Sequence, residues 1–148
     1  VDIDGGKLSF SQIECIKIKN DCLDISGSNF KGKLLKATNI GDKALSLGEK
    51  STGDIKELFV KSANIGVAVK DLSSLNLEKL SSEDINIEAA VFIKKNEFGP
   101  AELFIKKYDK LFEKKNFLIG KKSKFTLDKT LILGSIKNKK IRENLYIK

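Results

Sequence analysis

The 148-residue chain has no histidine, methionine or tryptophan, a single proline and two cysteines, Cys15 and Cys22. Without histidine, this segment cannot hold a Ser–His–acid triad, a Cys–His nucleophile or the usual transition-metal sites. Two thiols are too few for a disulfide framework and cannot complete a tetrahedral zinc shell. We therefore expect both cysteines to be small buried side chains that hold no metal, and the sequence leaves open whether they pair.

Long apolar runs are also absent. No stretch approaches the roughly 18 uninterrupted apolar residues of a membrane span, and Val1-Asp2-Ile3-Asp4 has neither the basic start nor the apolar run of a signal peptide. Because the chain does not begin with Met, we expect it to be a processed product or a fragment, with any targeting signal upstream. With no linker-like tract, residues 1–148 are predicted to form one domain.

The net charge of +8 is unevenly distributed. Residues 1–93 carry 12 Lys and 14 acidic residues, whereas residues 94–148 carry 16 basic and 6 acidic residues. A basic end attracts polyanions. However, Arg142 is the only arginine, and the aromatic residues are mostly Phe at core-like spacing. We therefore predict no nucleic-acid partner, since planar bidentate recognition favours Arg and single strands stack on exposed aromatic side chains.

A repeat is the strongest positive signal. Short alternating apolar segments recur at Leu23-Asp24-Ile25, Leu45-Ser46-Leu47, Val67-Ala68-Val69, Val91-Phe92-Ile93 and Phe117-Leu118-Ile119. The steps between them are 22, 22, 24 and 26 residues. A second apolar segment follows each one, and Asn and Gly punctuate the corners, as in Asn39-Ile40-Gly41, Asn64 and Asn86.

This period predicts an all-β fold, a right-handed parallel β-helix (solenoid) with coils of 22–26 residues. The alternate residues of the first segment should face one core: Leu23, Ile25, Leu45, Leu47, Val67, Val69, Val91, Ile93, Phe117 and Ile119. Residues 136–148 break the repeat and are predicted to form a basic C-terminal cap. The chain begins partway through a coil, so we expect N-terminal coils or another domain of a longer parent chain upstream.

Three segments support the same fold by resemblance. Residues 20–28 (NDCLDISGS), 41–51 (GDKALSLGEKS) and 66–73 (GVAVKDLS) resemble the right-handed parallel β-helix repeat family, within the pectate-lyase-like class. The chain is also similar to β-helical regions that accompany CotH-type kinase domains in bacterial secreted proteins. The resemblance implies the fold but no activity, because this family includes lyases, hydrolases, epimerases and adhesins. No kinase motif is present, and the lone Arg142 lies in the predicted cap.

One charged constellation is a candidate site. In a solenoid, Glu49 and Asp71 would be neighbours at a strand end. Lys70 and Lys94 would stack on one another beside them, and Lys95 would continue the acidic row. Three more charged residues, Asp24, Asp42 and Lys43, would lie on the flanking corners. Adjacent carboxylates repel, so they need a Lys, a cation or a proton between them. Such a group suits acid/base work on a uronic sugar or a Ca²⁺ ion, and it equally suits a solvated charge ladder neutralised by lysine. No resident metal or other cofactor is predicted.

Two functions follow from these observations. In the first, the chain is a non-catalytic module of a secreted or cell-envelope protein, structural or weakly binding an anionic polysaccharide. In the second, it is the C-terminal part of a polysaccharide lyase, hydrolase or epimerase. Converging carboxylates in a groove would favour the enzyme, and a paired charge ladder would favour the module. Localisation is expected to be extracellular or in the cell envelope.

Overall fold

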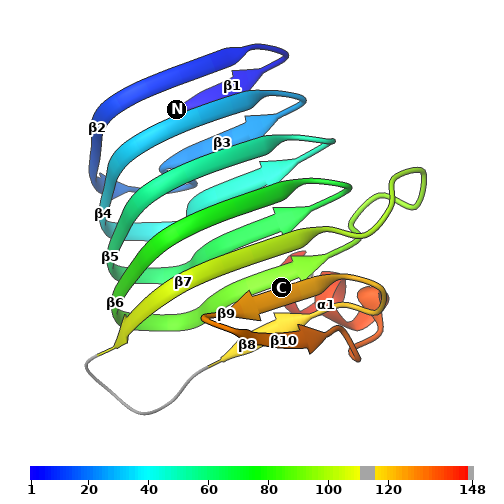
Figure 1. Cartoon of the computed structure of the whole chain (residues 1–148). Coiled ribbons are helices and arrows are strands. Elements are labelled where there is room, and N and C mark those ends of the chain that lie inside the picture. Colours follow the sequence, from blue (N-terminus) through cyan, green and yellow to red (C-terminus); the bar gives the residue numbers. More distant parts are fainter. Residues whose placement is uncertain (111–115, 147–148) are drawn as a thin grey trace.

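The computed structural model of the chain describes residues 1–110 and 116–146. Its elements are β1 (Asp2–Asp4), β2 (Lys7–Ile18), β3 (Leu23–Ser26), β4 (Asn29–Gly48), β5 (Thr52–Lys70), β6 (Ser74–Phe92), β7 (Glu102–Lys110), β8 (Phe117–Ile119), β9 (Lys124–Leu127), β10 (Thr130–Leu133) and α1 (Asn138–Tyr146). Strands β4, β5 and β6 each bend around most of a coil. Figure 1 shows these coils stacked from β1 at one end to β9 and β10 at the other.

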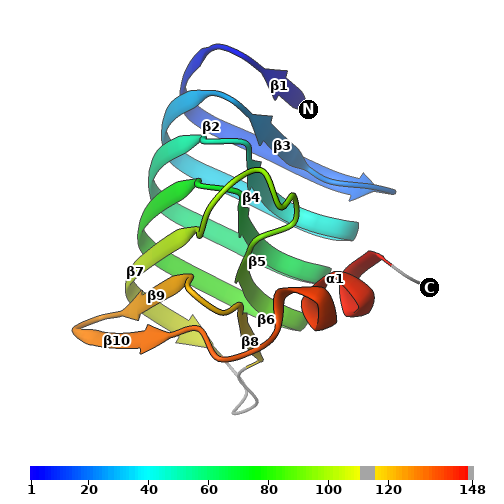
Figure 2. The same ribbon diagram turned by 90° about the vertical axis from the view of Figure 1, so that its right-hand side faces the viewer.

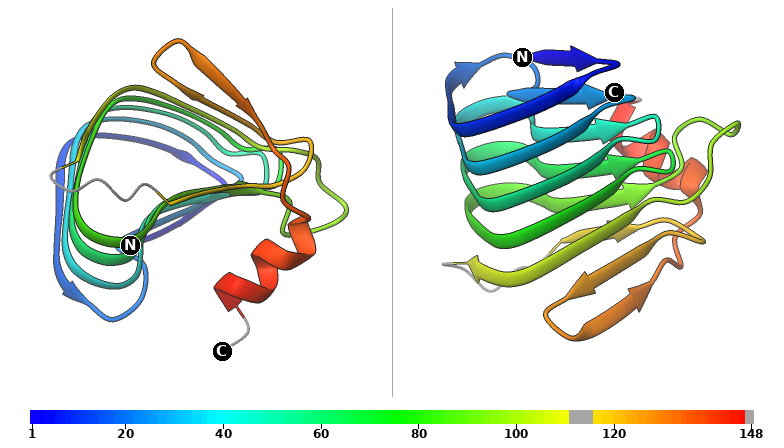
Figure 3. Two further views of the ribbon diagram at one scale, coloured as in Figure 1. Left: turned by 90° about the horizontal axis from the view of Figure 1, so that it is seen from below. Right: turned by 45° about the horizontal axis from the view of Figure 1, so that its top comes forward.

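Neighbouring coils pair in parallel, so that one residue of each coil lies beside its counterpart in the next. One such column runs the length of the stack and consists of Ile3, Ile25, Leu47, Val69, Val91 and Ile119. Viewed along the axis, the coils trace a rounded, roughly three-sided outline (Figure 3). The chain is therefore a parallel β-helix, and the predicted fold class is confirmed.

The register differs from the prediction at the fourth coil. Val67 pairs with Ala89 and Val69 with Val91, so the strand is Ala89–Val91 and not Val91–Ile93. Ile93 lies past the end of β6, half-buried, and donates its amide N–H to Oδ1 of Asn138 at 2.9 Å. The placement of Ile93 in the core column was therefore wrong. Alanine has weaker strand propensity than Val or Ile, which shifted the predicted strand by two residues.

The core column therefore advances by 22, 22 and 22 residues from Ile25 to Val91 and then by 28 to Ile119. The extra residues lie at one corner of the solenoid. Three residues separate β4 from β5 and β5 from β6, whereas the nine residues 93–101 separate β6 from β7. Figure 1 shows this longer loop projecting from the side of the stack.

The C-terminal helix does not close an end of the solenoid. Ile141 and Leu145 of α1 pack on an outward-facing apolar patch of the wall, formed by Ile65, Ala68, Ala90 and Phe92. Figures 2 and 3 show α1 lying along the outside of the coils, while the β9–β10 hairpin occupies the C-terminal end. The predicted cap, residues 136–148, thus covers a side wall in its described part. Residues 147 and 148 lie outside the described residues.

Cys15 and Cys22 form a disulfide across seven residues, with Cα atoms 5.7 Å apart. Both side chains are buried, as predicted. The bridge closes the short segment that carries the first coil from β2 into β3. It fixes the geometry of this corner, because the two ends of the loop can no longer separate.

Candidate functional site

Asp71, one of the predicted site residues, is buried in a corner between coils. Its Oδ1 accepts hydrogen bonds from the backbone N–H groups of Lys94 and Lys95, at 2.7 and 2.9 Å. Its backbone φ is 55°, in the left-handed region that turns the chain at this corner. The carboxylate therefore anchors the start of the long loop after β6, which is a structural role.

Glu49 lies at the same corner one coil earlier and forms an ion pair with the side chain of Lys95. The hydrogen bond from this ammonium to Glu49 raises the pKa of Lys95, and the side chains of Lys95 and Glu49 are 43% and 35% exposed. An exposed pair of this kind contributes little to stability, because solvent screens it. Glu49 is therefore neutralised by lysine, as in a charge ladder.

Lys70 is turned away from this corner and buried. Its register partner in the next coil is Phe92, not Lys94, so the predicted stacking of Lys70 on Lys94 is wrong. Its Nζ donates to Oγ of Ser46 at 2.9 Å. Burial lowers the pKa of Lys70, and the nearby carboxylate of Asp24 partly opposes this shift.

Lys43 belongs to a second group, close to the end of α1. It is 5% exposed, and its Nζ lies 3.4 Å from Asp21 and 2.5 Å from Asp42. The Nζ atoms of Lys43 and Lys94 lie 5.4 and 4.6 Å from the ring centroid of Tyr146. Burial raises the pKa of Tyr146, and the surrounding aspartates add to the shift. Burial also raises the pKa of Asp21, although Lys43 opposes the shift.

The predicted site residues thus divide into two groups. Glu49, Asp71 and Lys95 hold one corner of the solenoid, while Asp24, Asp42, Lys43, Lys70 and Lys94 lie around Ser46 and Tyr146. Within the described residues, no buried side-chain nitrogen or oxygen lacks a hydrogen-bond partner. The buried polar atoms of both groups are therefore hydrogen-bonded within the protein, which fits a structural role.

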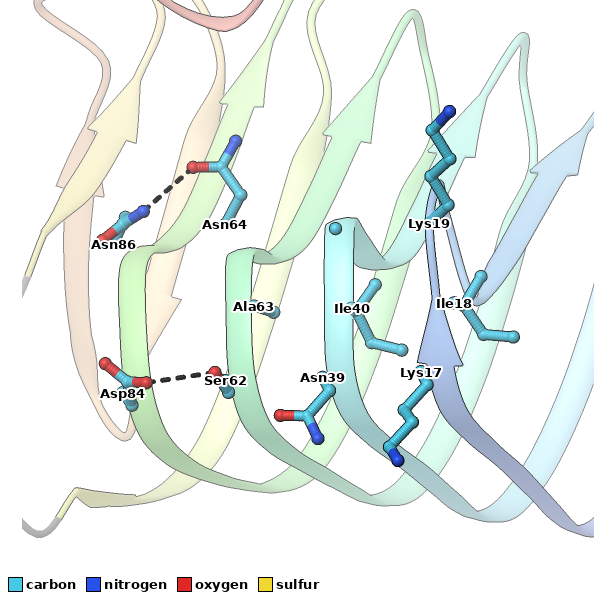
Figure 4. Close-up of a pocket in the computed structure, with 11 residues that line it drawn as sticks. Lys17, Ile18, Lys19, Asn39, Ile40, Ser62, Ala63, Asn64, Asp84 and Asn86 are labelled. Atoms are coloured by element: carbon cyan, nitrogen blue, oxygen red, sulfur yellow. Dashed lines mark hydrogen bonds between the residues drawn. The ribbon is translucent and has the colours of Figure 1, made fainter.

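A more open feature lies on another part of the surface. A groove of about 720 Å³ crosses four coils along the solenoid axis, and we call it the axial groove (Figure 4). It is lined by Lys17, Ile18, Lys19, Asn39, Ile40, Gly41, Ser62, Ala63, Asn64, Asp84 and Asn86.

The first rim of the axial groove is a column of residues with left-handed backbone: Lys17, Asn39, Ser62 and Asp84, with φ between 55° and 57°. Because the same unusual conformation recurs in each coil, every coil bends at the same place. Oγ of Ser62 donates to Oδ2 of Asp84 at 3.0 Å (Figure 4).

The floor and second rim follow directly in sequence. The floor is the column Ile18, Ile40 and Ala63, of which Ile40 and Ala63 are buried. The second rim carries Lys19, Asn64 and Asn86, and Nδ2 of Asn86 donates to Oδ1 of Asn64 at 3.2 Å (Figure 4).

Several polar groups of the axial groove are available to a ligand. Within the described part of the chain, the side chains of Lys17, Lys19 and Asn39 make no hydrogen bond or ion pair, and all three are exposed. They lie at the end of the groove nearest the disulfide. The groove is therefore cationic at one end, and its one carboxylate, Asp84, lies at the other.

Asn39, Asn64 and Asn86 stand out in the sequence as corner residues, but they were not predicted to be part of a site. A signal was present, since Lys17, Asn39, Ser62 and Asp84 recur at steps of 22, 23 and 22 residues. Their residue types differ, so the column becomes visible only through the shared backbone conformation.

The stacked parallel coils and continuous core define the chain as a β-solenoid. Searches against protein-family models, curated proteins and solved structures found no match for it. The resemblance to pectate-lyase-like and CotH-associated β-helices therefore stays a prediction. Among the described residues, no helix is long and apolar enough to span a membrane, and no three His, Cys, Asp or Glu side chains cluster as a metal site would require.

Proposed function

We propose that this chain is a non-catalytic parallel β-helix module of a secreted or cell-envelope protein, and that its axial groove binds a linear anionic glycan. The observation that carries the proposal is the construction of the groove. Two polar rims flank an apolar floor, and the three columns repeat over successive coils. A binding site for a small or polymeric ligand commonly combines an apolar surface with a few placed polar groups.

The repeat of the groove suits a polysaccharide. Coils are spaced by about 4.8 Å, close to the length of one pyranose unit, so equivalent side chains would meet successive sugars. The amides of Asn39 and Asn64 can both donate to and accept from sugar hydroxyls. Ile18, which is 36% exposed, offers an apolar surface to the C–H face of a sugar ring. Lys17 and Lys19 would contact carboxylate or sulfate groups.

The charged residues singled out by the sequence support a structural role instead. Asp71 accepts hydrogen bonds from backbone amides, Lys70 donates to Ser46, and Glu49 forms an ion pair with Lys95. A ligand, including a Ca²⁺ ion, would have to displace these contacts. We therefore favour the axial groove as the ligand site.

The groove also favours binding over catalysis. General acid–base work on a glycosidic bond needs two groups with complementary protonation states on either side of the scissile bond. Among the residues that line the axial groove, Asp84 is the one carboxylate, and it accepts a hydrogen bond from Ser62. The disulfide between Cys15 and Cys22 supports an extracellular or envelope location, because disulfides persist in oxidising compartments.

Calorimetry with a uronic-acid tetrasaccharide and a neutral glucose tetrasaccharide at low salt tests the proposal. The parent should bind the uronic-acid ligand more tightly, and the difference should shrink as salt shortens the Debye length. The Lys19→Ala/Asn64→Ala variant should bind at least about tenfold more weakly, a loss of about 1.4 kcal/mol.

The matched control is Lys7→Ala/Asn76→Ala, which changes the same residue types on another face of the solenoid. It should bind like the parent. An equal loss of affinity in both variants, or no binding of either glycan by the parent, would leave the chain as a structural module alone.

A further inference from the structure

Strand β10 is an open edge at the C-terminal end of the solenoid. It is the terminal strand of the sheet and, within the described residues, pairs only with β9. All four of its residues are exposed, and three of them are the apolar Leu131, Ile132 and Leu133. Exposed apolar edge strands are unusual in monomeric proteins, because they can pair with other chains.

The hairpin register identifies the free backbone groups. Thr130 lies opposite Leu127 across a two-residue loop, so this closing pair exchanges hydrogen bonds. Hydrogen-bonded and non-hydrogen-bonded pairs then alternate along the hairpin. In agreement with this, the amide N–H of Gly134 donates to the carbonyl of Ser123 at 2.9 Å. The even-numbered residues of β10 therefore bond to β9. The N–H and C=O groups of Leu131 and Leu133 point to the open edge.

Side chains of the same two residues extend an apolar surface onto neighbouring strands. Leu131 lies beside Thr126 of β9, which lies beside Phe104 of β7. Phe104, Leu131 and Leu133 are 39%, 55% and 65% exposed. A strand added to β10 would place alternate side chains against Leu131 and Leu133 and would satisfy their free amides.

The charge around this edge indicates the kind of strand. Lys124, which forms an exposed ion pair with Glu102 at 3.7 Å, lies opposite Leu133. Lys121, Lys122 and Lys129 flank the hairpin and are exposed as well. Residues 94–148 together carry ten more basic than acidic residues. A second copy of the chain would bring these lysines against one another, which disfavours self-pairing. A bilayer would leave the edge amides without hydrogen-bond partners, at a cost of several kcal/mol each.

We propose that β10 is a docking edge for an extended segment of another protein, with alternating apolar side chains and flanking acidic residues. The added strand would bond to the amides of Leu131 and Leu133, contact the Phe104–Leu131–Leu133 surface and place its carboxylates near Lys124 and Lys129. Because β10 has only four residues, the affinity should be modest and salt-dependent.

Fluorescence anisotropy with a labelled peptide, Glu-Asp-Val-Thr-Val-Thr-Val-Asp-Glu, tests the proposal. The parent should bind it more tightly than a version in which Lys replaces each flanking acid. Two further peptides carry N-methyl groups on the odd-numbered or on the even-numbered backbone amides. Their affinities should differ, because only one of these two sets of amides faces β10. Equal binding of the acidic and basic peptides, or of both N-methylated peptides, would contradict the proposal.

Two variants of the protein separate backbone pairing from apolar contact. Leu131→Pro removes an edge amide that β9 does not use, and edge strands tolerate Pro. Leu131→Glu/Leu133→Glu keeps the backbone and repels the peptide. Both should lower the affinity at least tenfold, whereas Ile16→Glu, at an equally exposed residue of β2, should not.

Sedimentation and vesicle binding test the other occupants of the edge. The parent should stay monomeric at the concentrations used and should not bind vesicles of anionic phospholipid through Leu131 and Leu133. Self-association abolished by Leu131→Pro would replace the proposal with a homodimer. Vesicle binding abolished by the double Glu variant would replace it with a membrane contact, and no peptide binding by a folded parent would overturn it.

Discussion

The ring of Phe30 lies against Gly53, its register partner in the next coil. A Cβ atom on Gly53 would overlap the ring, so this glycine is required by close packing. Gly32 accommodates Phe10 in the same way one coil earlier. Within the core, a large residue of one coil is thus matched by the absence of a side chain in the next.

Gly53→Ala should therefore lower the free energy of unfolding by about 1–3 kcal/mol through overpacking, measured by urea denaturation. Gly6→Ala, where a Cβ meets no atom within 4 Å, is the control and should have little effect. Adding Phe30→Leu to Gly53→Ala should cost less than the two single changes summed, because the smaller side chain relieves the overlap. A strictly additive double variant would contradict this packing.

Lys70 should make stability depend on pH. Burial lowers its folded-state pKa below the unfolded value of 10.5, so the buried ammonium destabilises the fold at neutral pH. Between the lowered pKa and 10.5 the unfolded chain binds more protons, and stability rises with pH. The variant Lys70→Met/Ser46→Ala replaces both partners. At pH 7 its free energy of unfolding should equal that of the parent or exceed it by up to about 2 kcal/mol.

The advantage of Lys70→Met/Ser46→Ala over the parent should shrink as pH rises toward 10.5, the unfolded-state pKa of Lys70. Lys31→Met, at an exposed lysine, is the control and should track the parent throughout. Denaturation curves collected between pH 7 and 10 measure the difference. A difference in free energy of unfolding between variant and parent that stays constant with pH would show that the pKa of Lys70 does not change on folding.

Reduction of the Cys15–Cys22 bridge should act on the first coil and on the end of the axial groove. The closed loop is short, so its loss should cost about 2 kcal/mol in the chain-entropy account. Lys17 and Lys19 lie inside that loop, so reduced protein should also bind the uronic-acid tetrasaccharide more weakly. Dithiothreitol titration of the parent, beside Cys15→Ala/Cys22→Ala, measures both effects. Unchanged stability on reduction would contradict a tethering role.

The fold could be predicted because the alternation of apolar and polar residues and the period of the repeat are visible in the sequence. Leu23, Leu45 and Val67 recur at a constant step of 22, and their side chains share one core. The prediction failed where Ala89 and Ala90 continue the strand, because alanine gives no strong strand signal. Ala89 faces the core and Ala90 lies beneath α1. The nine-residue loop 93–101 makes the next coil longer, so Ile119 still lies in the core column, as predicted.

The candidate site was harder to predict. Charged residues such as Lys70 and Asp71 looked like ligand-binding groups, yet adjacent positions face different environments once the chain turns at a corner. Lys70 bonds to Ser46 in the wall, while Asp71 bonds to loop amides. The axial groove depends on left-handed backbone at Lys17, Asn39, Ser62 and Asp84, and four different residue types give no common sequence signal for it.

The central claim, that the axial groove binds an anionic glycan, is tested most directly by side-chain amide NMR. Titration with the uronic-acid tetrasaccharide should shift the Nδ2–H resonances of Asn39, Asn64 and Asn86. Asn76, whose Nδ2 donates to Asp54 on another face, should stay unchanged. Shifts confined to the Glu49–Lys95 corner, or no shift at saturating ligand, would contradict the account.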